Sequence, residues 1–240
     1  MTVRIRRVTT TRAGGVSKPP FDTFNLGDHV GDDPKAVAAN RRRLGQATGL
    51  GDRLVWMNQI HSDRVVTVGE DQARGGPVDA ADGLVTTARG LGLAVVTADC
   101  VPVLLADARA GVVGAVHAGR VGAQHGIVMR AVEAMRVAGA RTEDISVLLG
   151  PAVSGRNYEV PEEMAAEVEA ALPGSRTSTA RGTAGLDLRA GIARQLTGIG
   201  ITAVDIDPRC TVADRTLFSH REAQRAGTRT GRLASLVWME

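Results

Sequence analysis

The sequence predicts an α+β fold with mixed or antiparallel sheets and with helices on the outside. Several short apolar runs of strand character follow one another without a helix between them, unlike the regular alternation of a doubly wound α/β protein. No repeat of fixed period and no low-complexity linker divides the chain, so a single domain over residues 1–240 is expected. With 43% hydrophobic and 23% charged residues, the chain has the composition of a soluble globular protein.

The strands are expected in short apolar runs that are rich in valine, leucine and isoleucine. These runs are 3–8, 53–57, 64–68, 83–87, 93–97, 101–107, 112–116, 146–149, 203–207 and 233–238. Segment 10–33 has no clear periodicity, and ordered loops of that length are uncommon unless they have a function.

Helix signals occur in four places. Asp33 followed by Pro34 provides an N-cap and a first-turn proline for a helix that runs to about Gly45. Apolar residues recur at helical spacing over 121–138, and two further helices are expected over 162–172 and 187–196. Segments 74–83 and 172–187 are rich in small, turn-forming residues and are expected to be loops.

Charge and apolar patterning predict no nucleic-acid partner and no membrane partner. The formal net charge is only +3, and the adjacent Arg42 and Arg43 have no neighbouring aromatic residues to stack on bases. No apolar run reaches the roughly 18 residues that a membrane span requires. Two cysteines in 240 residues do not indicate a disulfide framework, so a reducing, cytoplasmic location is expected.

Three potential metal ligands follow apolar strands. His61, Cys100 and His117 each lie just past the end of such a run. Two imidazoles and one thiolate match a catalytic zinc site, which uses three protein ligands and leaves a fourth position open. Because their spacing is long and irregular, hydrogen-bonded histidines at loop starts and a small buried cysteine remain alternatives. Cys210 is expected to be structural rather than a ligand.

Motifs along essentially the whole chain resemble the laccase-domain, or multicopper-polyphenol-oxidase-like, family. They include NQIHSDRVV, ADGLVTT, TADCVPVLLAD, VHAGRVG, LGPAVSGRNYEV and TGRLASLVWM. The resemblance implies a single domain layered α-β-β-α, and a metal site, usually zinc, at His61, Cys100 and His117. It also implies purine nucleoside phosphorylase activity, with adenosine deaminase and methylthioadenosine phosphorylase activities in the same pocket.

Further residues are candidates for catalysis or for substrate binding. A carboxylate at the end of an apolar run is costly to bury without a partner or a chemical role. Asp99 is therefore interpreted either as a group that exchanges protons beside the metal, or as a carboxylate that caps the following turn or orients His117. Cys100 is assigned both to catalysis and to metal binding. Substrate binding is assigned to Asn40, Arg41, Gln59, Arg120 and Arg221.

Several of these assignments have structural alternatives. For Gln59, tying its loop is slightly favoured over binding a purine. For Arg41, a salt bridge is slightly favoured over a contact with phosphate or ribose. The chain also departs from the family pattern, because VHAGRVG lacks a tryptophan and Glu222 replaces an arginine after Arg221. These departures weaken the expected phosphate site around Arg120 and Arg221.

The favoured function is a zinc-dependent purine nucleoside phosphorylase whose partners are purine nucleosides and phosphate. The alternative is a cytoplasmic amidase that edits peptidoglycan precursors through the Cys100–His117 pair. A copper-dependent phenol oxidase is less favoured, because a laccase needs further coppers and many more histidines than the five present. A binding module with a structural zinc would need a fourth ligand, from His125 or Cys210.

Overall fold

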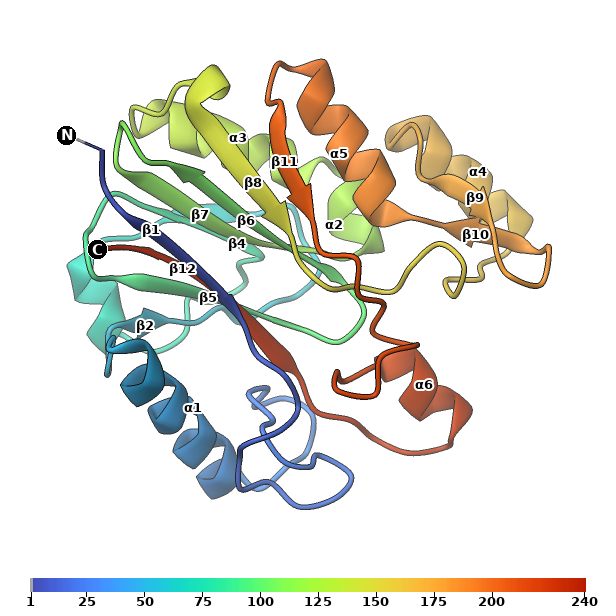
Figure 1. Ribbon diagram of the computed structural model, residues 1–240, viewed down its shortest axis with the longest axis horizontal. Helices are drawn as coiled ribbons and strands as arrows, with labels where there is room; N and C mark the ends of the chain where they lie inside the picture. Colours follow the sequence, from blue (N-terminus) through green and yellow to red (C-terminus); the bar gives the residue numbers. More distant parts are fainter. Residues whose placement is uncertain (1) are drawn as a thin grey trace.

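Two stacked β-sheets form the centre of the protein, as the computed structural model of residues 2–240 shows (Figure 1). One sheet has the strand order β1-β12-β5-β2, the other has the order β11-β8-β6-β7-β4-β3, and β9 and β10 form a separate hairpin. Both large sheets are mixed. The pairs β2–β5, β3–β4 and β8–β11 are parallel. The central pairs β5–β12, β6–β7 and β6–β8 are antiparallel. The predicted α+β class with mixed sheets is confirmed.

The four-stranded sheet contains β1 (Ile5–Thr9), β12 (Leu233–Met239), β5 (Gly92–Thr97) and β2 (Leu54–Val55). The six-stranded sheet contains β11 (Ala203–Ile206), β8 (Ile145–Leu149), β6 (Val101–Asp107), β7 (Val112–Ala118), β4 (Gly83–Thr86) and β3 (Val65–Thr67). The hairpin of β9 (Arg176–Ser178) and β10 (Ala184–Leu186) lies where only a loop was expected, over 172–187.

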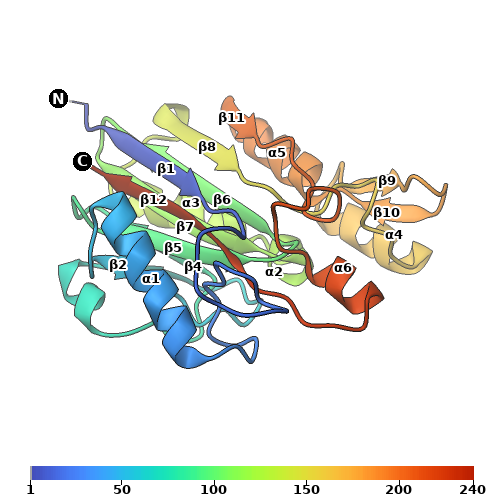
Figure 2. The ribbon, with the colours of Figure 1, turned by 60° about the horizontal axis from the view of Figure 1, so that its bottom comes forward.

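Helices cover the outer faces of both sheets. The helices of the described residues are α1 (Pro34–Thr48), α2 (Arg120–Gln124), α3 (Ile127–Val137), α4 (Glu162–Ala171), α5 (Leu188–Gly198) and α6 (His220–Arg225), with 3-10 turns at Glu70–Arg74 and Thr142–Asp144. Figure 2 shows α1 against the four-stranded sheet, and α3 and α5 on the far side of the six-stranded sheet. This is the α-β-β-α layering that the family resemblance implies. Among the described residues, no helix has the length and apolar character needed to cross a membrane.

The helix caps agree with the sequence, and one predicted helix is divided. Asp33 accepts a hydrogen bond from the backbone N–H of Lys35 at 2.9 Å, and Asp187 accepts one from that of Ala190 at 3.1 Å. The single helix expected over 121–138 is wrong, because Gly126 adopts a left-handed φ of +76° and separates α2 from α3. This conformation suits glycine and interrupts the helical hydrogen-bond ladder.

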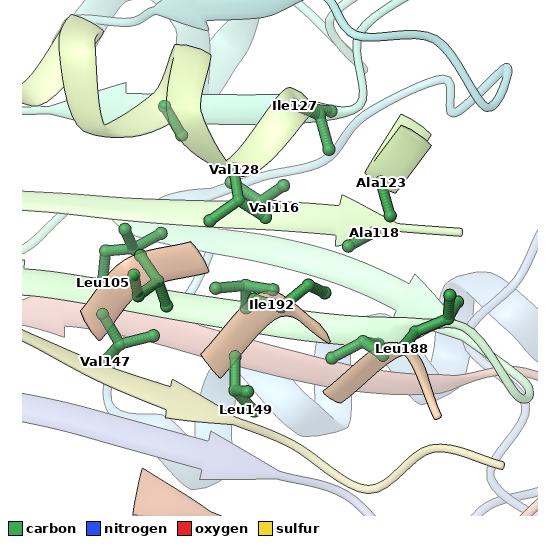
Figure 3. Packing of buried hydrophobic residues seen from close by; sticks show 14 of the residues in the cluster. Leu105, Val116, Ala118, Ala123, Ile127, Val128, Val147, Leu149, Leu188 and Ile192 are labelled. Atoms are coloured by element: carbon green, nitrogen blue, oxygen red, sulfur yellow. The ribbon is translucent and has the colours of Figure 1, made fainter. Parts of the chain in front are cut away.

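The largest part of the core lies between the six-stranded sheet and its helices. Figure 3 shows Val116 and Leu105 of the sheet packed beneath Val128 of α3 and Ile192 of α5. A second layer, which includes Leu93 of β5 and other fully buried aliphatic side chains, fills the space between the two sheets. With few aromatic residues available, aliphatic packing holds the layers together and fixes the strand ends that carry the candidate site.

Pairing of β6 with β7 brings distant residues together at one end of the sheets. These strands are antiparallel, with Val101 opposite Ala118 and Pro102 opposite His117. Cys100, which immediately precedes β6, therefore lies beside the end of β7. The connection from β5 to β6 passes through the same corner, so Asp99 and Cys100 occupy a tight turn rather than a strand interior.

Segment 10–33 is irregular, as predicted, and a buried side chain of α1 holds it. The Asn40 Oδ1 atom accepts a hydrogen bond from the backbone N–H of Val16 at 2.9 Å. Its Nδ2 donates to Ser17 Oγ at 3.0 Å and to the carbonyls of Thr23 at 3.2 Å and Asn25 at 2.9 Å. One amide side chain thus satisfies backbone groups at several points of the loop.

We expect Asn40→Ala to lower the free energy of unfolding by about 1–3 kcal/mol, because it leaves buried backbone donors and acceptors without partners. Urea denaturation of the whole protein measures the change. Gln46→Ala, at an exposed position of the same helix, is the matched control and should change stability by no more than about 0.5 kcal/mol. Equal midpoints for the two variants would contradict an anchoring role for Asn40.

Candidate metal centre

The structure brings His61, Cys100 and His117 together. One ligand atom of each lies within 4.8 Å of the other two, and Cys100 Sγ is 4.0 Å from His61 Nε2. The two imidazole rings meet edge to face, with centroids 4.7 Å apart and an angle of 79° between their planes. His61 comes from the loop after β2, Cys100 from the β5–β6 turn and His117 from β7. His117 is buried whereas His61 is exposed, so the cluster is open on one side.

Asp82 joins the two histidines, and sequence reasoning missed it. Its carboxylate is fully buried and accepts a hydrogen bond from His117 Nδ1 at 2.8 Å. It also accepts from the backbone N–H groups of Ile60 at 3.2 Å, His61 at 3.0 Å and Ser62 at 2.7 Å, and from the Ser62 hydroxyl at 2.8 Å. Because Nδ1 of His117 donates to Asp82, its Nε2 is left to act as a ligand.

Opposite charges stabilise one another within the cluster. Burial raises the pKa of Cys100, but the charge and hydrogen bonding of His117, together with His61, outweigh burial and lower it. Burial lowers the pKa of His117, but Cys100 and Asp82 outweigh burial and raise it. Burial also opposes ionisation of Asp82, yet hydrogen bonds from His117 and Ser62 lower its pKa to about 2. Cys100 is therefore favoured as a thiolate, the form that binds metals.

The backbone is specialised on both sides of the cluster. His61 has a φ of 63° and Asp99 has a φ of 91°, in the left-handed region that non-glycine residues seldom occupy. Gly119 lies close to two of the ligands: a Cβ atom there would be 2.9 Å from His61 Cδ2 and 3.2 Å from Cys100 Sγ. A side chain at position 119 would crowd the ligands, so the sequence HAG keeps this space free.

The donor set fits a metal ion. Two imidazole nitrogens and a thiolate are ligands that Zn²⁺ and copper accept. A metal-bound histidine usually donates its other ring N–H to a carboxylate such as Asp82. In the part of the chain that the structure describes, neither His125 nor Cys210 joins the cluster. A structural site with four protein ligands is therefore not formed by these residues, which favours a site with an open position.

Cys210 lies apart from the metal cluster. Its Sγ accepts hydrogen bonds from the backbone N–H of Ser154 at 3.3 Å and from Asn157 Nδ2 at 3.4 Å, and its backbone bridges to Ala152. These contacts join the segment after β11 to the segment after β8. They are consistent with the structural role expected from the sequence.

Asp99 points its carboxylate at three donors from the C-terminal part of the chain. Oδ1 accepts from Thr211 Oγ1 at 2.6 Å and from Ser219 Oγ at 2.7 Å, and Oδ2 accepts from the backbone N–H of Arg221 at 2.6 Å. Asp82, rather than Asp99, contacts His117. The carboxylate thus neither orients His117 nor caps the following turn, the two structural roles considered from the sequence, but fixes the start of α6 beside Cys100. Proton exchange by Asp99 stays a prediction.

Two cavities flank Cys100. The Arg221 cavity, of about 140 Å³, is lined on its own side by Asp99, Arg120, Val153, Tyr158, Leu188, Arg221 and Gln224. The Thr97 cavity, of about 160 Å³, is lined on its own side by His29, Gln59, His61, Thr97, His117 and Arg232. Ala98, Cys100 and His220 line both cavities, so the two chambers adjoin at Cys100, whereas His61 and His117 line the Thr97 cavity alone.

Three of the residues assigned to substrate line these chambers. In the Arg221 cavity, Arg221 lies 4.7 Å from the centroid of the Tyr158 ring and donates one bond to the carbonyl of Glu159, and Arg120 donates one bond to Gln124. Gln59 lines the Thr97 cavity. Its amide is bonded at 2.8 Å to both the N–H and the C=O of Val96, so it ties its loop to β5.

Asn40 and Arg41 line neither chamber. Arg41 forms an ion pair with Asp28 at 3.1 Å, donates to the carbonyl of Leu26 and lies 4.2 Å from the centroid of the Trp56 ring. Both residues thus stabilise segment 10–33 and its contact with α1. The salt-bridge alternative for Arg41 agrees with this position, and the assignment of the two residues to substrate binding stays a prediction.

Comparison with known proteins agrees with this architecture. Residues 6–240 match the family described as multi-copper polyphenol oxidoreductase laccase. The chain belongs to this family. YlmD from Geobacillus stearothermophilus, a solved member of similar structure, superposes with a TM-score of 0.91 at 32% identity, over 98% of this chain and 92% of that one. YfiH from Bacillus licheniformis superposes with a TM-score of 0.89 at 30% identity, over 98% and 93% of the two chains.

Laccase-family relatives with curated names are closer still in sequence. A protein of Mycobacterium tuberculosis named purine nucleoside phosphorylase is 70% identical over 241 residues, covering 100% of this chain and 94% of the relative. A protein of Corynebacterium glutamicum with the same name is 57% identical, covering 98% of this chain and 94% of the relative. The resemblance that the sequence motifs indicated is therefore confirmed.

The structure predicts that Asp82→Asn weakens metal binding by about 10–100-fold, the usual effect of removing the carboxylate behind a histidine ligand. An amide oxygen retains part of the hydrogen bonding but cannot hold the negative charge opposite His117. Competition with a zinc chelator measures the change in affinity.

Asp79→Asn is the matched control for this measurement. Asp79 lies in the same loop, but its exposed carboxylate accepts from Asn58 and does not contact a ligand. Its replacement should leave zinc affinity unchanged within a factor of about two. If Asp82→Asn binds zinc as tightly as this control, the buried carboxylate does not support the metal centre.

Proposed function

We propose that this protein is an enzyme that cleaves purine nucleosides by phosphorolysis, with zinc bound by His61, Cys100 and His117. The observation that carries the proposal is that this cluster lines the Thr97 cavity and adjoins, through Cys100, a second cavity lined by Arg120 and Arg221. The names of the closely similar relatives support the same reaction and imply small-molecule substrates.

Zinc is favoured over copper by the donor set. A His₂Cys set with one open position is typical of catalytic zinc, whereas a blue-copper centre adds a weak axial ligand such as methionine. Among the described residues, no methionine lines either chamber. The exposed side of His61 leaves a direction from which water or substrate can approach the ion.

The Arg221 cavity is the chamber suited to phosphate. Arg120 and Arg221 both line it, and each uses only one N–H of its guanidinium in the hydrogen bonds described above. A guanidinium has five N–H donors in a planar fork that matches a phosphate, so both side chains retain donors for an anion. Tyr158 holds the Arg221 guanidinium against its ring. With these two arginines the cavity can bind phosphate although Glu222 replaces the arginine of the family pattern.

The Thr97 cavity is then the chamber for the purine. Each chamber alone is smaller than the roughly 300 Å³ at the low end of ligand pockets, whereas the two together approach that size. A nucleoside that places its ribose near Cys100 would extend its base into the Thr97 cavity. Its anomeric carbon would then face a phosphate held by Arg120 and Arg221.

Phosphorolysis is better supported here than deamination of adenosine. When bound, zinc supplies Lewis-acid polarisation of an atom of the substrate or activates a water. Deamination also needs a carboxylic acid that shuttles protons beside the metal. The two nearby carboxylates, Asp82 and Asp99, already accept several protein hydrogen bonds each. Phosphorolysis needs no carboxylate beside the metal, and the same chambers would serve 5′-methylthioadenosine.

One observation favours a second candidate, a Cys–His hydrolase acting on an amide of a peptidoglycan precursor. Cys100, His117 and Asp82 form a chain in which the carboxylate orients the imidazole and the imidazole stabilises the thiolate. Nucleophilic cysteine enzymes use the same order of groups. In this mechanism Cys100 would attack the carbonyl, so metal bound to the thiolate would inhibit rather than activate the enzyme.

Metal analysis separates these candidates. We expect about one zinc per chain after expression without added metal, as three protein ligands imply. Cys100→Ala should lose tight zinc binding and remain folded, because Cys100 lies in a turn at the end of the sheets. Elemental analysis and circular dichroism measure both. Full zinc occupancy in Cys100→Ala would exclude the thiolate as a ligand, and Cys210→Ala is the control that should keep its metal.

Phosphate dependence tests the reaction itself. We expect metal-loaded protein to release free base from inosine or adenosine only when phosphate is present, with ribose 1-phosphate as the other product. Arg221→Ala should raise the KM for phosphate about tenfold or more, the effect of losing a hydrogen bond to a charged group. Chromatography of released base across a phosphate titration measures both effects.

Arg225→Ala, one turn further along α6, is the matched control for Arg221→Ala. Arg225 is exposed and does not line the Arg221 cavity, so its loss should leave the KM for phosphate unchanged. Base release without phosphate would indicate hydrolysis instead of phosphorolysis. Release of an amino acid from a peptidoglycan precursor, with no cleavage of any nucleoside, would assign the function to the hydrolase.

A further inference from the structure

His220 lies at the junction of the two chambers that flank the metal cluster. It is the first residue of α6 and lines both the Arg221 cavity and the Thr97 cavity. Only Ala98 and Cys100 share that position, and Cys100 is committed to the metal cluster. His220 is therefore the one side chain on both chambers that has an exchangeable proton and is not already engaged there.

The surroundings of His220 fix the backbone but leave the imidazole unengaged. The residues before and after it, Ser219 and Arg221, are both hydrogen-bonded to the Asp99 carboxylate. Within the described part of the chain, the His220 ring makes no hydrogen bond and no ion pair, and the residue is partly exposed to solvent while it lines both chambers. Its backbone is held while both ring nitrogens remain available to a ligand.

Charged groups around His220 favour the neutral ring. Burial lowers its pKa, Arg232 and Arg221 lower it further, and Asp99 opposes them. Arg232 faces it from the segment before β12, Arg221 from α6 and Asp99 from the β5–β6 turn. A neutral imidazole has one donor nitrogen and one acceptor nitrogen, so it can accept a proton on one side and donate one on the other.

The proposed reaction requires such a transfer. A phosphate oxygen forms a bond to the anomeric carbon, the bond from that carbon to the purine nitrogen breaks, and its electron pair stays on the base. Hydrogen phosphate carries one proton that the ribose 1-phosphate dianion no longer carries, whereas the released purine has gained one. One proton thus moves from the phosphate to the base, with no other reactant needed.

We propose that His220 relays this proton: one ring nitrogen accepts it from the phosphate in the Arg221 cavity, and the other donates a proton to the purine in the Thr97 cavity. The inference rests on the phosphorolysis proposed above and adds a catalytic residue to it. A polar side chain in the wall of the Thr97 cavity agrees with a polar ligand there. Thr97 is 2% exposed, and its hydroxyl has no hydrogen-bond partner among the described residues, so one buried polar group in the wall of this cavity is left without a bond.

The alternatives for the proton donor are less well placed. Tyr158 lines only the Arg221 cavity, and burial raises the pKa of its phenol. His29 lines only the Thr97 cavity and lies near the Asp28 carboxylate, at 3.5 Å. Neither side chain reaches both reactants. Asp99 lines the Arg221 cavity alone and already accepts three hydrogen bonds.

The decisive experiment compares two substrates of metal-loaded protein, inosine and 7-methylinosine. A purine methylated at nitrogen 7 already carries a positive charge, so it leaves as a neutral base without receiving a proton. We expect His220→Gln to lower kcat for inosine on the order of 10²-fold, the usual value of general acid–base catalysis. The kcat for 7-methylinosine should fall less than about threefold, because its departure needs no acid.

The matched control is His125→Gln, since His125 is an exposed histidine that lines neither chamber. Both substrates should react with it as they do with the unmodified protein. Zinc content and melting temperature of each variant establish that the fold and the metal site are retained. His220→Tyr, which restores a side chain with a proton to donate, should recover part of the inosine rate if its hydroxyl reaches the base.

Each outcome decides the proposal. Equal losses of kcat on both substrates would show that His220 only positions the substrate, and unchanged rates would show that the proton takes another path. Either result overturns the relay and leaves phosphorolysis intact. If the unmodified protein releases no base in phosphate from either nucleoside, the proposed function itself is wrong, and the relay falls with it.

Discussion

The candidate metal centre depends on the buried carboxylate of Asp82. A desolvated negative charge is costly unless hydrogen bonds surround it, and this one accepts bonds from both sides of the cluster. One side is the loop that carries His61, and the other is the imidazole of His117 in β7. The cost of burying Asp82 is offset only when the backbone of residues 60–62 and the imidazole of His117 are both in place. The carboxylate thus links the formation of the loop to the orientation of the ligands.

The third ligand reaches the cluster through strand pairing instead. Cys100 sits at the turn between two fully buried strands of different sheets, and the register of β6 on β7 places it beside His117. Asp99, in the same turn, bonds to Ser219 and to the backbone of Arg221. A shift of α6 would therefore disturb the turn that carries the thiolate. The Asp99 side chain therefore holds α6, which borders the chambers, against the turn that carries Cys100.

Sequence reasoning identified the features that have a strong local signal. Strands and caps could be predicted because buried strands have apolar runs and helix N-termini need a hydrogen-bond acceptor, as at Asp33 and Asp187. The ligands could be proposed because polar residues at the ends of such strands are unusual. Asp82 could not, because an aspartate in the segment ADG is equally typical of a turn, and nothing local shows that it meets His117 thirty-five positions away.

Other features depend on contacts that no short pattern contains. The six residues of α6 are too few for a helical periodicity, and the break at Gly126 depends on a left-handed φ that the apolar spacing around it conceals. The β9–β10 hairpin formed within a segment whose small residues indicated a loop. The two chambers are built from segments of every part of the chain. Their lining, and the place of His220 between them, follow only from the packed structure.

The distribution of hydrogen bonds around the cluster distinguishes scaffold from reactive groups. Asp82, Asp99 and Gln59 are polar and close to the ligands, but the protein itself occupies their oxygens. Displacing such bonds for a substrate would leave buried donors unpaired, at about 1–3 kcal/mol for each group. The donors that remain for a substrate include those of Arg120, Arg221 and His220. Cationic and proton-exchanging groups of this kind suit the transfer of an anion to a sugar carbon. They do not supply the free carboxylate that activation of water would use.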